Sequence, residues 1–472
     1  MQLISLGFQP VAGNQLSLVT SGGAISGRFA QFVDPFVTGP GFNTIELVYN
    51  RNSVLLEFLN IVARTKPGTP PAIVSTIDFV SFAQNTNQSS SAALLAKSEL
   101  DPRLATLIGF LFKEPFANLP GDLEKLSPDG LSSFYEIGFS DSNIQRVTLE
   151  DRLDAVRNGS SGFSSNMNLN NATVYLVGKE VVDGKSSPAE VQPVLQPGPE
   201  NRWGVWTTGF GDFVSVDSDG NGKGYDFTTG GVSVGLDYRL TDHLVIGAMI
   251  DYSHTWTSEK PAGHIDVNSG RGGLYASWFN HGFYLNGAIY AGHNSYDSGR
   301  SGLGGLANGS SGGTEWSTFL AGGYDFHFGP LTVGPIAALQ YTYVNIGEFS
   351  ENGSLAPMQI QSDSVNSLRS DVGFRLFYQW QVGKVLIEPS LRAAWEHEYL
   401  YSALPITAGF VDVPGSTATF FGPSEGHDSA VVSAGVTVQW TPALATYISY
   451  DGQLGRGNYD SNAVTGGVWI SF

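Results

Sequence analysis

Residues 369–396, RSDVGFRLFYQWQVGKVLIEPSLRAAWE, contain two segments in which apolar residues alternate with polar or small ones. In the first segment residues such as Phe374 alternate with Arg, Asp and Gly, and in the second residues such as Leu391 alternate with Glu, Ser and Arg. A period of two places alternate side chains on opposite faces of a β-strand. Only a short connection at Val382-Gly383 separates the segments, so the pattern predicts two antiparallel strands joined by a tight turn.

The same period recurs from Arg202 to Phe472. The apolar segments run roughly 10 residues, the length that a tilted strand needs to cross a bilayer. The fold class is therefore all-β, with a 12-stranded antiparallel transmembrane β-barrel over residues 202–472. We expect its strands to start near residues 202, 226, 243, 265, 283, 315, 331, 367, 384, 428, 444 and 461.

The connections between these strands alternate in length. Every second one is very short, and the others are long and rich in Gly, Ser, Asn and Asp. Soluble sandwiches have no reason to sort loops in this way, whereas outer-membrane barrels have short periplasmic turns and long outer loops. The glycine string at 302–313 lacks a following Lys-Ser/Thr, so we interpret it as a flexible outer loop and not as a phosphate-binding loop. The long connections cover 215–225, 257–264, 297–313, 347–365, 399–426 and 453–460.

The polar face of the predicted strands holds Gly, Ser, Thr and sparse charges of both signs, which suits a polar lumen. Aromatic residues at strand ends, such as Trp256 and Trp440, suit the girdles at the two membrane interfaces. The charged residues expected to line the lumen are Asp251, Arg369, Asp371, Arg375, Glu388, Arg392 and Glu396.

Composition excludes several classes of protein. The 472 residues include no cysteine, which excludes a disulfide scaffold and thiol-ligated metal sites. Net charge is −19, a poor match to nucleic acid, and no apolar run reaches the length of a membrane-spanning helix. Met1 to Gly13 lacks the features of a signal peptide, which at face value implies the cytoplasm. A barrel contradicts that location, so we expect either a piece of a longer precursor or a misassigned start.

The residues before the barrel divide into three stretches. Residues 1–62 contain short strands with Gly turns. Residues 63–158 turn helical from about Ile73, with one run after Ser127-Pro128-Asp129 and another beginning near Ser140 and Ser142. The charges at Glu150-Asp151-Arg152 and Asp154 to Arg157 are most simply a solvated helix face. Residues 159–201 lose periodicity and are interpreted as a tether.

The chain resembles the C-terminal part of a type V autotransporter. The ending Val468-Trp469-Ile470-Ser471-Phe472 is similar to the terminal-Phe strand of that family, and Trp203 to Gly211 resembles its first barrel strand. Ser21 to Phe29 is similar to the last rungs of a passenger β-helix. Leu126 to Leu153 resembles the family's helical linker.

This resemblance implies a function. The barrel would insert in the bacterial outer membrane, a preceding segment would occupy its lumen, and the passenger upstream would reach the cell surface. It implies as partners the membrane lipid, the barrel-assembly machinery and the chain's own passenger, with no cofactor and no enzymatic activity. The assembly signal would comprise Val464, Val468, Ile470 and Phe472. The implied domains are a passenger remnant (1–62), a helical linker (63–158), a lumen-threading tether (159–201) and the translocator barrel (202–472).

Alternatives remain open at this stage. Asp217 to Gly222 copies the first half of a calcium loop, but its twelfth position is Thr228 and strands flank it, so a hairpin loop explains it better. His-Asp pairs, His264 with Asp266 and His427 with Asp428, accompany no nucleophile elbow. Self-cleavage could use Asn170-Asn171 in the tether or the wall carboxylates Asp251, Glu388 and Glu396. The remaining alternative is an adhesin that binds through its N-terminal remnant and outer loops.

Overall fold

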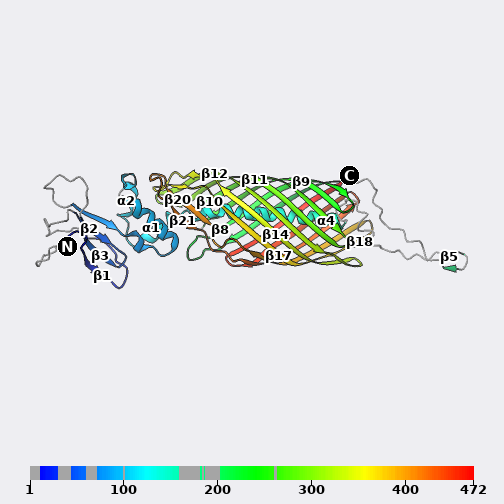
Figure 1. Cartoon of the computed structure of the whole chain (residues 1–472), viewed down its shortest axis with the longest axis horizontal. Helices are drawn as coiled ribbons and strands as arrows, with labels where there is room; N and C mark the ends of the chain where they lie inside the picture. Colours follow the sequence, from blue (N-terminus) through cyan, green and yellow to red (C-terminus); the bar gives the residue numbers. More distant parts are fainter. Residues whose placement is uncertain are drawn as a thin grey trace.

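The computed structural model describes residues 11–29, 44–59, 72–98, 101–158, 181–182, 185–186, 202–259 and 263–472. The molecule is elongated, with a long barrel, an N-terminal unit beyond one barrel end and the C-terminus at the other end (Figure 1). Among the described residues, no helix has the length and apolar character required to cross a membrane.

Twelve long antiparallel strands form the barrel wall. Successive strands pair along the chain, and the ring closes where the last strand, β24, pairs with the first, β7. The prediction of a 12-stranded antiparallel barrel is confirmed. The strands are β7 (Trp203–Val216), β8 (Tyr225–Thr241), β9 (Leu244–Glu259), β10 (Gly263–Asn280), β11 (Phe283–Gly302), β12 (Gly305–Tyr324), β14 (Leu331–Ile346), β17 (Asp363–Tyr378), β19 (Val385–Glu398), β22 (Asp428–Thr441), β23 (Leu444–Arg456) and β24 (Tyr459–Ser471).

The period of two in each strand separates an apolar exterior from a polar interior. In β9, for example, Ile250 and Tyr252 are 67% and 52% exposed on the outer wall, whereas Asp251 and Ser253 between them are buried in the lumen. The short connections lie at the barrel end where β7 begins, and two short strands there, β13 (Phe326–Phe328) and β18 (Trp380–Val382), extend the wall. Gly329 and Gly383 take positive φ in these turns, a conformation that glycine adopts without strain.

The glycine string at 302–313 is not a loop over most of its length, because β12 begins at Gly305. Its backbone pairs residue by residue with β11, for example Ser310 with Asp297. Glycine and serine have the backbone groups that a ladder needs but no apolar side chains, so hydrophobic alternation cannot reveal this part of the strand.

The long connections at the other barrel end are also partly folded. Four short strands from two of these connections form one antiparallel sheet, which we call the cap sheet: β15 (Phe349–Ser350), β16 (Met358–Ile360), β20 (Pro405–Phe410) and β21 (Ala418–Phe421). Its residues Met358, Ile406 and Phe420 are buried. The cap sheet therefore shares one hydrophobic core with the N-terminal unit and the start of α4.

The N-terminal unit begins with a second four-stranded sheet, formed by β1 (Gln15–Thr20), β2 (Thr44–Tyr49), β3 (Ser53–Leu59) and β4 (Ala72–Ile77). Its order is β1-β3-β2-β4, and β4 pairs in parallel with β2. The expectation of helix from Ile73 is wrong for β4, because its backbone completes this sheet and Ile77 is buried there. The sheet's inward residues, such as Leu56 and Phe58, are fully buried.

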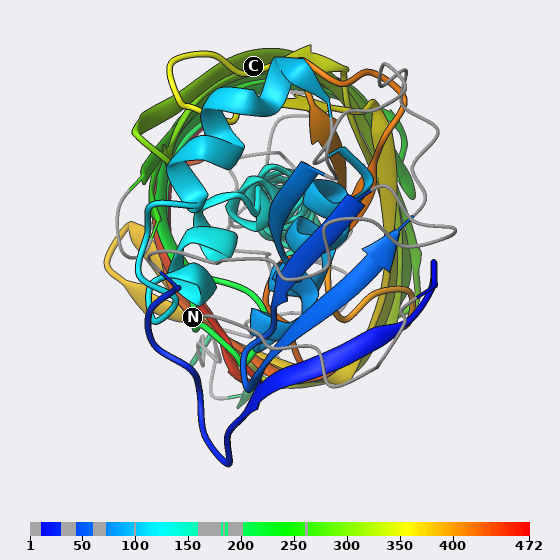
Figure 2. The same ribbon diagram turned by 90° about the vertical axis from the view of Figure 1, so that its left-hand side faces the viewer.

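Three short helices lie between this sheet and the barrel, namely α1 (Thr86–Ser98), α2 (Ala105–Leu111) and α3 (Leu119–Lys125) (Figure 1). The fourth helix, α4 (Ser133–Asn158), runs inside the barrel, as the view along the barrel shows (Figure 2). Of the tether, only the paired strands β5 (Val181–Val182) and β6 (Lys185–Ser186) are described. The other tether residues, with the Asn170-Asn171 pair, lie outside the described residues.

The expectation of two separate helical runs is wrong, because α4 is continuous over 26 residues after a short turn at Asp129–Ser132. Ser140 does not cap a helix; its hydroxyl donates instead to the wall carboxylate of Asp212. A side chain at Gly138 would place its Cβ 2.8 Å from Val344 on β14, so glycine lets the helix approach the wall closely.

Candidate functional site: the helix-filled lumen

Most charged residues of α4 are buried and Asp151 and Asp154 are half-buried, so the interpretation of Glu150 to Arg157 as a solvated face is wrong. Arg146 and Arg152 are at most 1% exposed, and Glu150 and Arg157 are also buried. The barrel interior is itself a polar surface, and a polar helix face packs against it as readily as it faces water. Sequence periodicity cannot separate these two surroundings.

The surface end of α4 meets residues from the loops and strand ends around the cap sheet. The carboxylate of Glu136 accepts a hydrogen bond from the Tyr401 hydroxyl at 3.0 Å. The guanidinium groups of Arg369 and Arg456 each lie 3.8 Å from the same carboxylate. Arg456 also pairs with Glu425 at 3.0 Å, so this group joins α4, the wall and an outer loop.

One turn further along α4, a single wall arginine gathers three carboxylates. Arg271 on β10 pairs with Asp251 at 2.7 Å and also with Glu315 and with Asp141 of α4. All four side chains are fully enclosed. Ser253 donates a hydrogen bond to Asp141 at 3.0 Å and thereby ties the helix to a second strand.

The middle of α4 carries an ion-pair network toward β17 and β19. Arg146 of the helix pairs with Asp371 at 2.7 Å and lies 3.8 Å from Glu396. Glu150, one turn later, pairs with Arg392, and Arg392 also pairs with Asp371 at 3.0 Å. Charges of both signs therefore alternate between helix and wall, which offsets the cost of burying each of them.

The last turns of α4 face the short-turn end of the barrel. Arg152 donates to both oxygens of Asp237, at 2.8 and 2.9 Å, and neither side chain is more than 1% exposed. Asp154 pairs with Arg375 at 2.5 Å. Arg157 donates to the amide oxygen of Asn286 at 3.1 Å. Loss of one partner from such a buried pair costs about 3–5 kcal/mol, so each contact holds the helix in one position.

The seven residues expected in the lumen all have side chains directed inward, where six are buried and Arg392 is 15% exposed. The structure brings Arg369, Asp371, Arg392 and Glu396 together around the part of α4 between Glu136 and Glu150. Asp251, Arg375 and Glu388 lie apart from them. Glu388 accepts a hydrogen bond from Asn158 at 3.3 Å. Their role in translocation stays a prediction.

Sequence reasoning missed the wall residues Asp212, Asp237, Arg271, Glu315 and Asp325, which share this interior. The signal was present for the first four, because each occupies the inward position in the alternation of its strand. Asp325 lies between β12 and β13, outside that alternation. The helix residues Asp141 and Arg146 gave no such signal, since no pattern in α4 indicates a polar enclosure.

The other candidate sites find different surroundings. Asp219 of the calcium-like loop accepts backbone hydrogen bonds from Asn221 and Gly222 at 2.7 and 2.6 Å, as a turn-forming aspartate does. Across the described part of the chain, no group of three or more His, Asp or Glu residues is arranged to hold a metal ion.

The His-Asp pairs suggested by sequence are not the pairs that form. Asp428 contacts His397 at 2.8 Å, whereas His427 contacts the carbonyl oxygen of Glu398. Asp266 lies 4.0 Å from His254, on a neighbouring strand. These contacts lie at strand ends on the outer wall.

The last strand presents an apolar outer face. Val464, Ile470 and Phe472 are 43%, 45% and 59% exposed there, and Val468 lies between them on the same face. The backbones of Phe472 and Trp203 exchange two hydrogen bonds, of 3.0 and 3.1 Å, which complete the closure between β24 and β7. A role for these residues as an assembly signal stays a prediction.

A closed barrel with an apolar outer wall and a lumen filled by a preceding helix defines an outer-membrane barrel of the translocator class. The model of the autotransporter beta-domain family matches residues 205–451, which is just over half of the chain. The chain therefore belongs to the autotransporter family, lies in the outer membrane and delivers a passenger to the cell surface.

Known proteins that resemble the chain include an extracellular serine protease of Serratia marcescens, which is 25% identical over 279 residues. That match covers 56% of this chain and 26% of the protease, so the chain spans about a quarter of the length of the curated relatives it matches.

Solved structures of similar fold include the translocator domain of the autotransporter NalP from Neisseria meningitidis, at 18% identity and a TM-score of 0.48. The structural match covers 58% of this chain and 90% of the NalP domain. The transport unit of AIDA-I from Escherichia coli is 17% identical with a TM-score of 0.43, over 67% and 98% of the two chains.

Proposed function

We propose that this chain is a non-catalytic translocator whose lumen holds α4 once the passenger has passed, so that the N-terminal unit stays attached at the cell surface. The observation that carries the proposal is the set of buried ion pairs that join α4 to the wall over most of its length, from Glu136 to Asp154. A segment that only passed through would have no reason to match the wall charge for charge.

Contacts outside the lumen support retention of the N-terminal unit. Asn87 of α1 donates to the Phe421 carbonyl oxygen of the cap sheet at 2.8 Å and accepts from the Phe421 N–H at 2.9 Å. The same side chain donates to the Asn221 carbonyl oxygen at 3.0 Å. Arg300 of the wall donates to the Lys125 carbonyl oxygen at the end of α3 at 2.9 Å. These bonds fix the helices to the loops at the long-loop end of the barrel.

We further propose that the barrel-assembly machinery is a partner, that it recognises β24, and that the chain divides at residues 62, 158 and 201.

The curated relatives are named for proteolysis, but the match covers only 26% of their length. We assign any such activity to an upstream passenger and none to this chain. The wall carboxylates that self-cleavage would use are engaged in other contacts: Asp251 with Arg271, and Glu396 with Arg146 and Arg369.

The test places a signal peptide and a small folded reporter upstream of Met1. We expect the reporter to become accessible to protease on intact cells and to stay attached to the barrel. The matched control is a chain that ends at Asn458 and so lacks β24, for which we expect no surface reporter. A reporter that remains inside cells expressing the full chain would contradict the proposal.

The same cells test the self-processing alternative. The variant Asp251→Asn/Glu388→Gln/Glu396→Gln, checked for faster migration when unboiled, should leave the size of the reporter fusion unchanged. Release of the reporter by the unaltered chain but not by this variant would show that the barrel is catalytic.

A further inference from the structure

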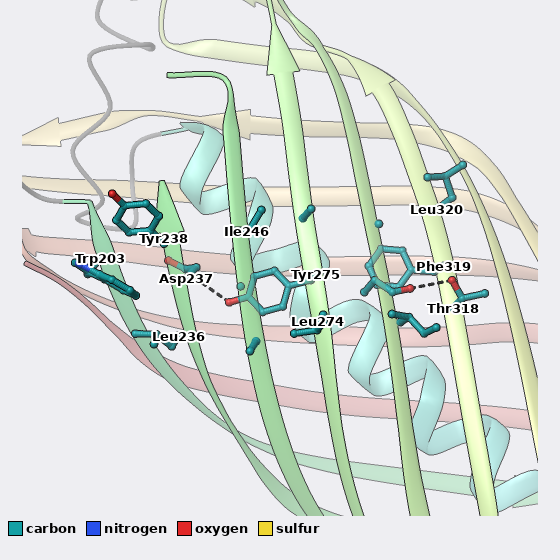
Figure 3. A pocket seen from close by; sticks show the side chains of 16 residues that line it. Trp203, Leu236, Asp237, Tyr238, Ile246, Leu274, Tyr275, Thr318, Phe319 and Leu320 are labelled. Carbon is teal, nitrogen blue, oxygen red and sulfur yellow. Dashed lines mark hydrogen bonds between the residues drawn. The ribbon is translucent and has the colours of Figure 1, made fainter. Parts of the chain in front are cut away.

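The calcium-like sequence lies in the connection between β7 and β8, residues 217–224, which we call the β7–β8 loop. The opposite ends of these two strands carry Trp203 and Tyr238, which pair in register at the short-turn end (Figure 3). The β7–β8 loop is at the long-loop end, where the side-chain oxygen of Asn221 accepts a hydrogen bond from the Asn87 N–H of α1 at 3.0 Å. The loop therefore lies where the wall meets the N-terminal unit.

The barrel itself holds the β7–β8 loop in place. The Asp219 carboxylate accepts a hydrogen bond at 2.9 Å from the N–H of Ser424, in the connection before β22. The Asp217 N–H donates at 3.0 Å to the carbonyl oxygen of Asn458, in the turn before β24. Because β24 and β7 are the strands that close the ring, the loop has all these anchors in the closed barrel. Wall residues thus build this surface without any part of the helical linker.

Lys223 of the β7–β8 loop contacts the linker at two successive places. Its ammonium group donates a hydrogen bond to the Glu124 carbonyl oxygen of α3 at 3.1 Å and lies 3.7 Å from the Glu124 carboxylate. The ammonium also lies 3.7 Å from the carboxylate of Asp129, in the short turn before α4, and the Lys223 backbone N–H donates to that carboxylate at 2.9 Å. One wall residue therefore joins the end of α3 to the start of α4.

Burial makes Asp129 dependent on this contact. Its side chain is 0% exposed, and among the described residues Lys223 is the one cation within 4.0 Å of its carboxylate. A buried carboxylate that loses its cation is strongly destabilised. Glu124 is partly exposed and also accepts a hydrogen bond from Gln88 of α1 at 3.1 Å, so the group around Lys223 extends into the N-terminal unit.

We propose that the β7–β8 loop is the docking site for the linker at the long-loop end of the barrel, with Lys223 as its positioning residue. The proposal rests on the retention of the N-terminal unit proposed above and adds a second hold, outside the lumen. The ion pairs of α4 fix the helix inside the wall. Lys223 fixes the segment between α3 and α4, and with it the place of the N-terminal unit over the barrel.

The test is maleimide labelling of the purified full chain in detergent, with one introduced thiol. Ser133→Cys places the thiol at the first residue of α4, where the serine is buried and its hydroxyl has no hydrogen-bond partner within the described part of the chain. Ala155→Cys places it near the other end of α4. Lys223→Met removes the ammonium, and Lys223→Arg keeps a cation. The matched control is Lys125→Met, because Lys125 at the end of α3 pairs with Asp122 at 3.3 Å but is 49% exposed.

We expect Lys223→Met to raise the labelling rate of Ser133→Cys by about tenfold, because a buried carboxylate loses a partly exposed cation. Lys223→Arg should restore most of the protection. The labelling rate of Ala155→Cys should stay unchanged, because the ion pairs of the lumen still hold that end of α4. Lys125→Met should change neither rate. Hydrogen exchange of the Ser424 amide should also stay unchanged in Lys223→Met, since the loop keeps its anchors to the wall.

A Ser133→Cys labelling rate that Lys223→Met leaves unaltered would overturn the proposal. Lost protection of the Ser424 amide in Lys223→Met would also overturn it, because Lys223 would then serve only the fold of its own loop. An equal rise at Ser133→Cys and Ala155→Cys would assign Lys223 to the packing of the whole helix and not to a docking site. Failure of the retention itself would appear separately, as a reporter released from cells that express the unaltered chain.

Discussion

The buried pair between Arg152 and Asp237 allows a quantitative test of how firmly α4 is held. Arg152→Met keeps much of the side-chain volume but leaves the Asp237 carboxylate enclosed without its guanidinium. Removal of one partner from a buried pair costs about 3–5 kcal/mol, and Asp237 keeps the hydrogen bond from Tyr275 at 3.1 Å, which favours the lower end. At 1.36 kcal/mol per factor of ten, about 3 kcal/mol raises the population with α4 displaced by about 10²-fold.

The chain has no cysteine, so a single introduced thiol reports this displacement without background. Ala155→Cys places the thiol on α4, where residue 155 is 3% exposed, and the rate of maleimide labelling follows the fraction of time that α4 leaves its position. We expect Arg152→Met to raise this rate by about 10²-fold at neutral pH, in protein that still migrates as a folded barrel. Arg152→Met/Asp237→Leu, which removes both charges, should recover most of the protection.

The control is Arg103→Met, which breaks a pair whose arginine is 56% exposed and should leave the labelling rate unchanged. A labelling rate in Arg152→Met within threefold of the unaltered rate would refute the reasoning. It would mean that packing around α4, and not its ion pairs, sets the helix position.

Three further predictions follow from the wall, the last residue and one loop. Ile250→Arg on the outer wall should lower the free energy of unfolding by about 2–4 kcal/mol, measured by urea titration of the barrel folded into vesicles. Val11→Arg, at a 49% exposed residue of the N-terminal unit, should lower it by almost nothing. Similar losses in the two variants would contradict the assignment of the lipid face. Phe472→Ala should refold normally in detergent but assemble poorly in cells, and an equal loss in cells for Trp440→Ala, which is 49% exposed, would show that Phe472 is only an interfacial anchor. Burial acts to raise the pKa of Asp219, but backbone hydrogen bonds from Ser424, Gly222 and Asn221 outweigh it and lower the pKa below its usual 3.8. The stability that the carboxylate contributes is therefore present above about pH 4 and lost as pH falls further. Asp219→Asn should therefore weaken hydrogen-exchange protection of the Ser424 and Gly222 amides at pH 7, with a difference that shrinks below pH 3.8; a difference independent of pH would contradict this.

The barrel was predictable from the sequence because lipid outside and polar lumen inside impose a period of two on every strand. The strand at 385–398 shows this directly, with Leu391 and Trp395 outward and Arg392 and Glu396 inward. The start of β12 was not predictable, because its Gly and Ser residues pair only through backbone. The inward direction of Asp251 and Arg375 followed from parity in the same way.

The position of α4 was beyond reach of the sequence for a different reason. The charges from Glu150 to Arg157 are typical of a solvated helix face. The wall partner of Arg152, Asp237, lies far along the chain, as does Asp371, the partner of Arg146. Such pairs are set by the three-dimensional enclosure and leave no local signal. Likewise, Ser140 has the form of a helix cap, but α4 continues through it and its hydroxyl donates a hydrogen bond to Asp212 of the wall.

The passage of α4 through a closed ring constrains the order of events during biogenesis. Folded parts stand beyond the long-loop end of the ring, where α1 bonds to the cap sheet, and the chain re-enters the wall as β7 from the opposite end. A helix with so many buried charges cannot reach the lumen sideways through lipid, because each Arg or Asp in hydrocarbon costs about 2.5–3.5 kcal/mol. Either the wall closes around α4, or α4 is drawn along the axis while the N-terminal unit is still unfolded. In the second case the hydrogen bonds between Asn87 and the cap sheet can form only after the N-terminal unit has emerged, so they mark the end of transit.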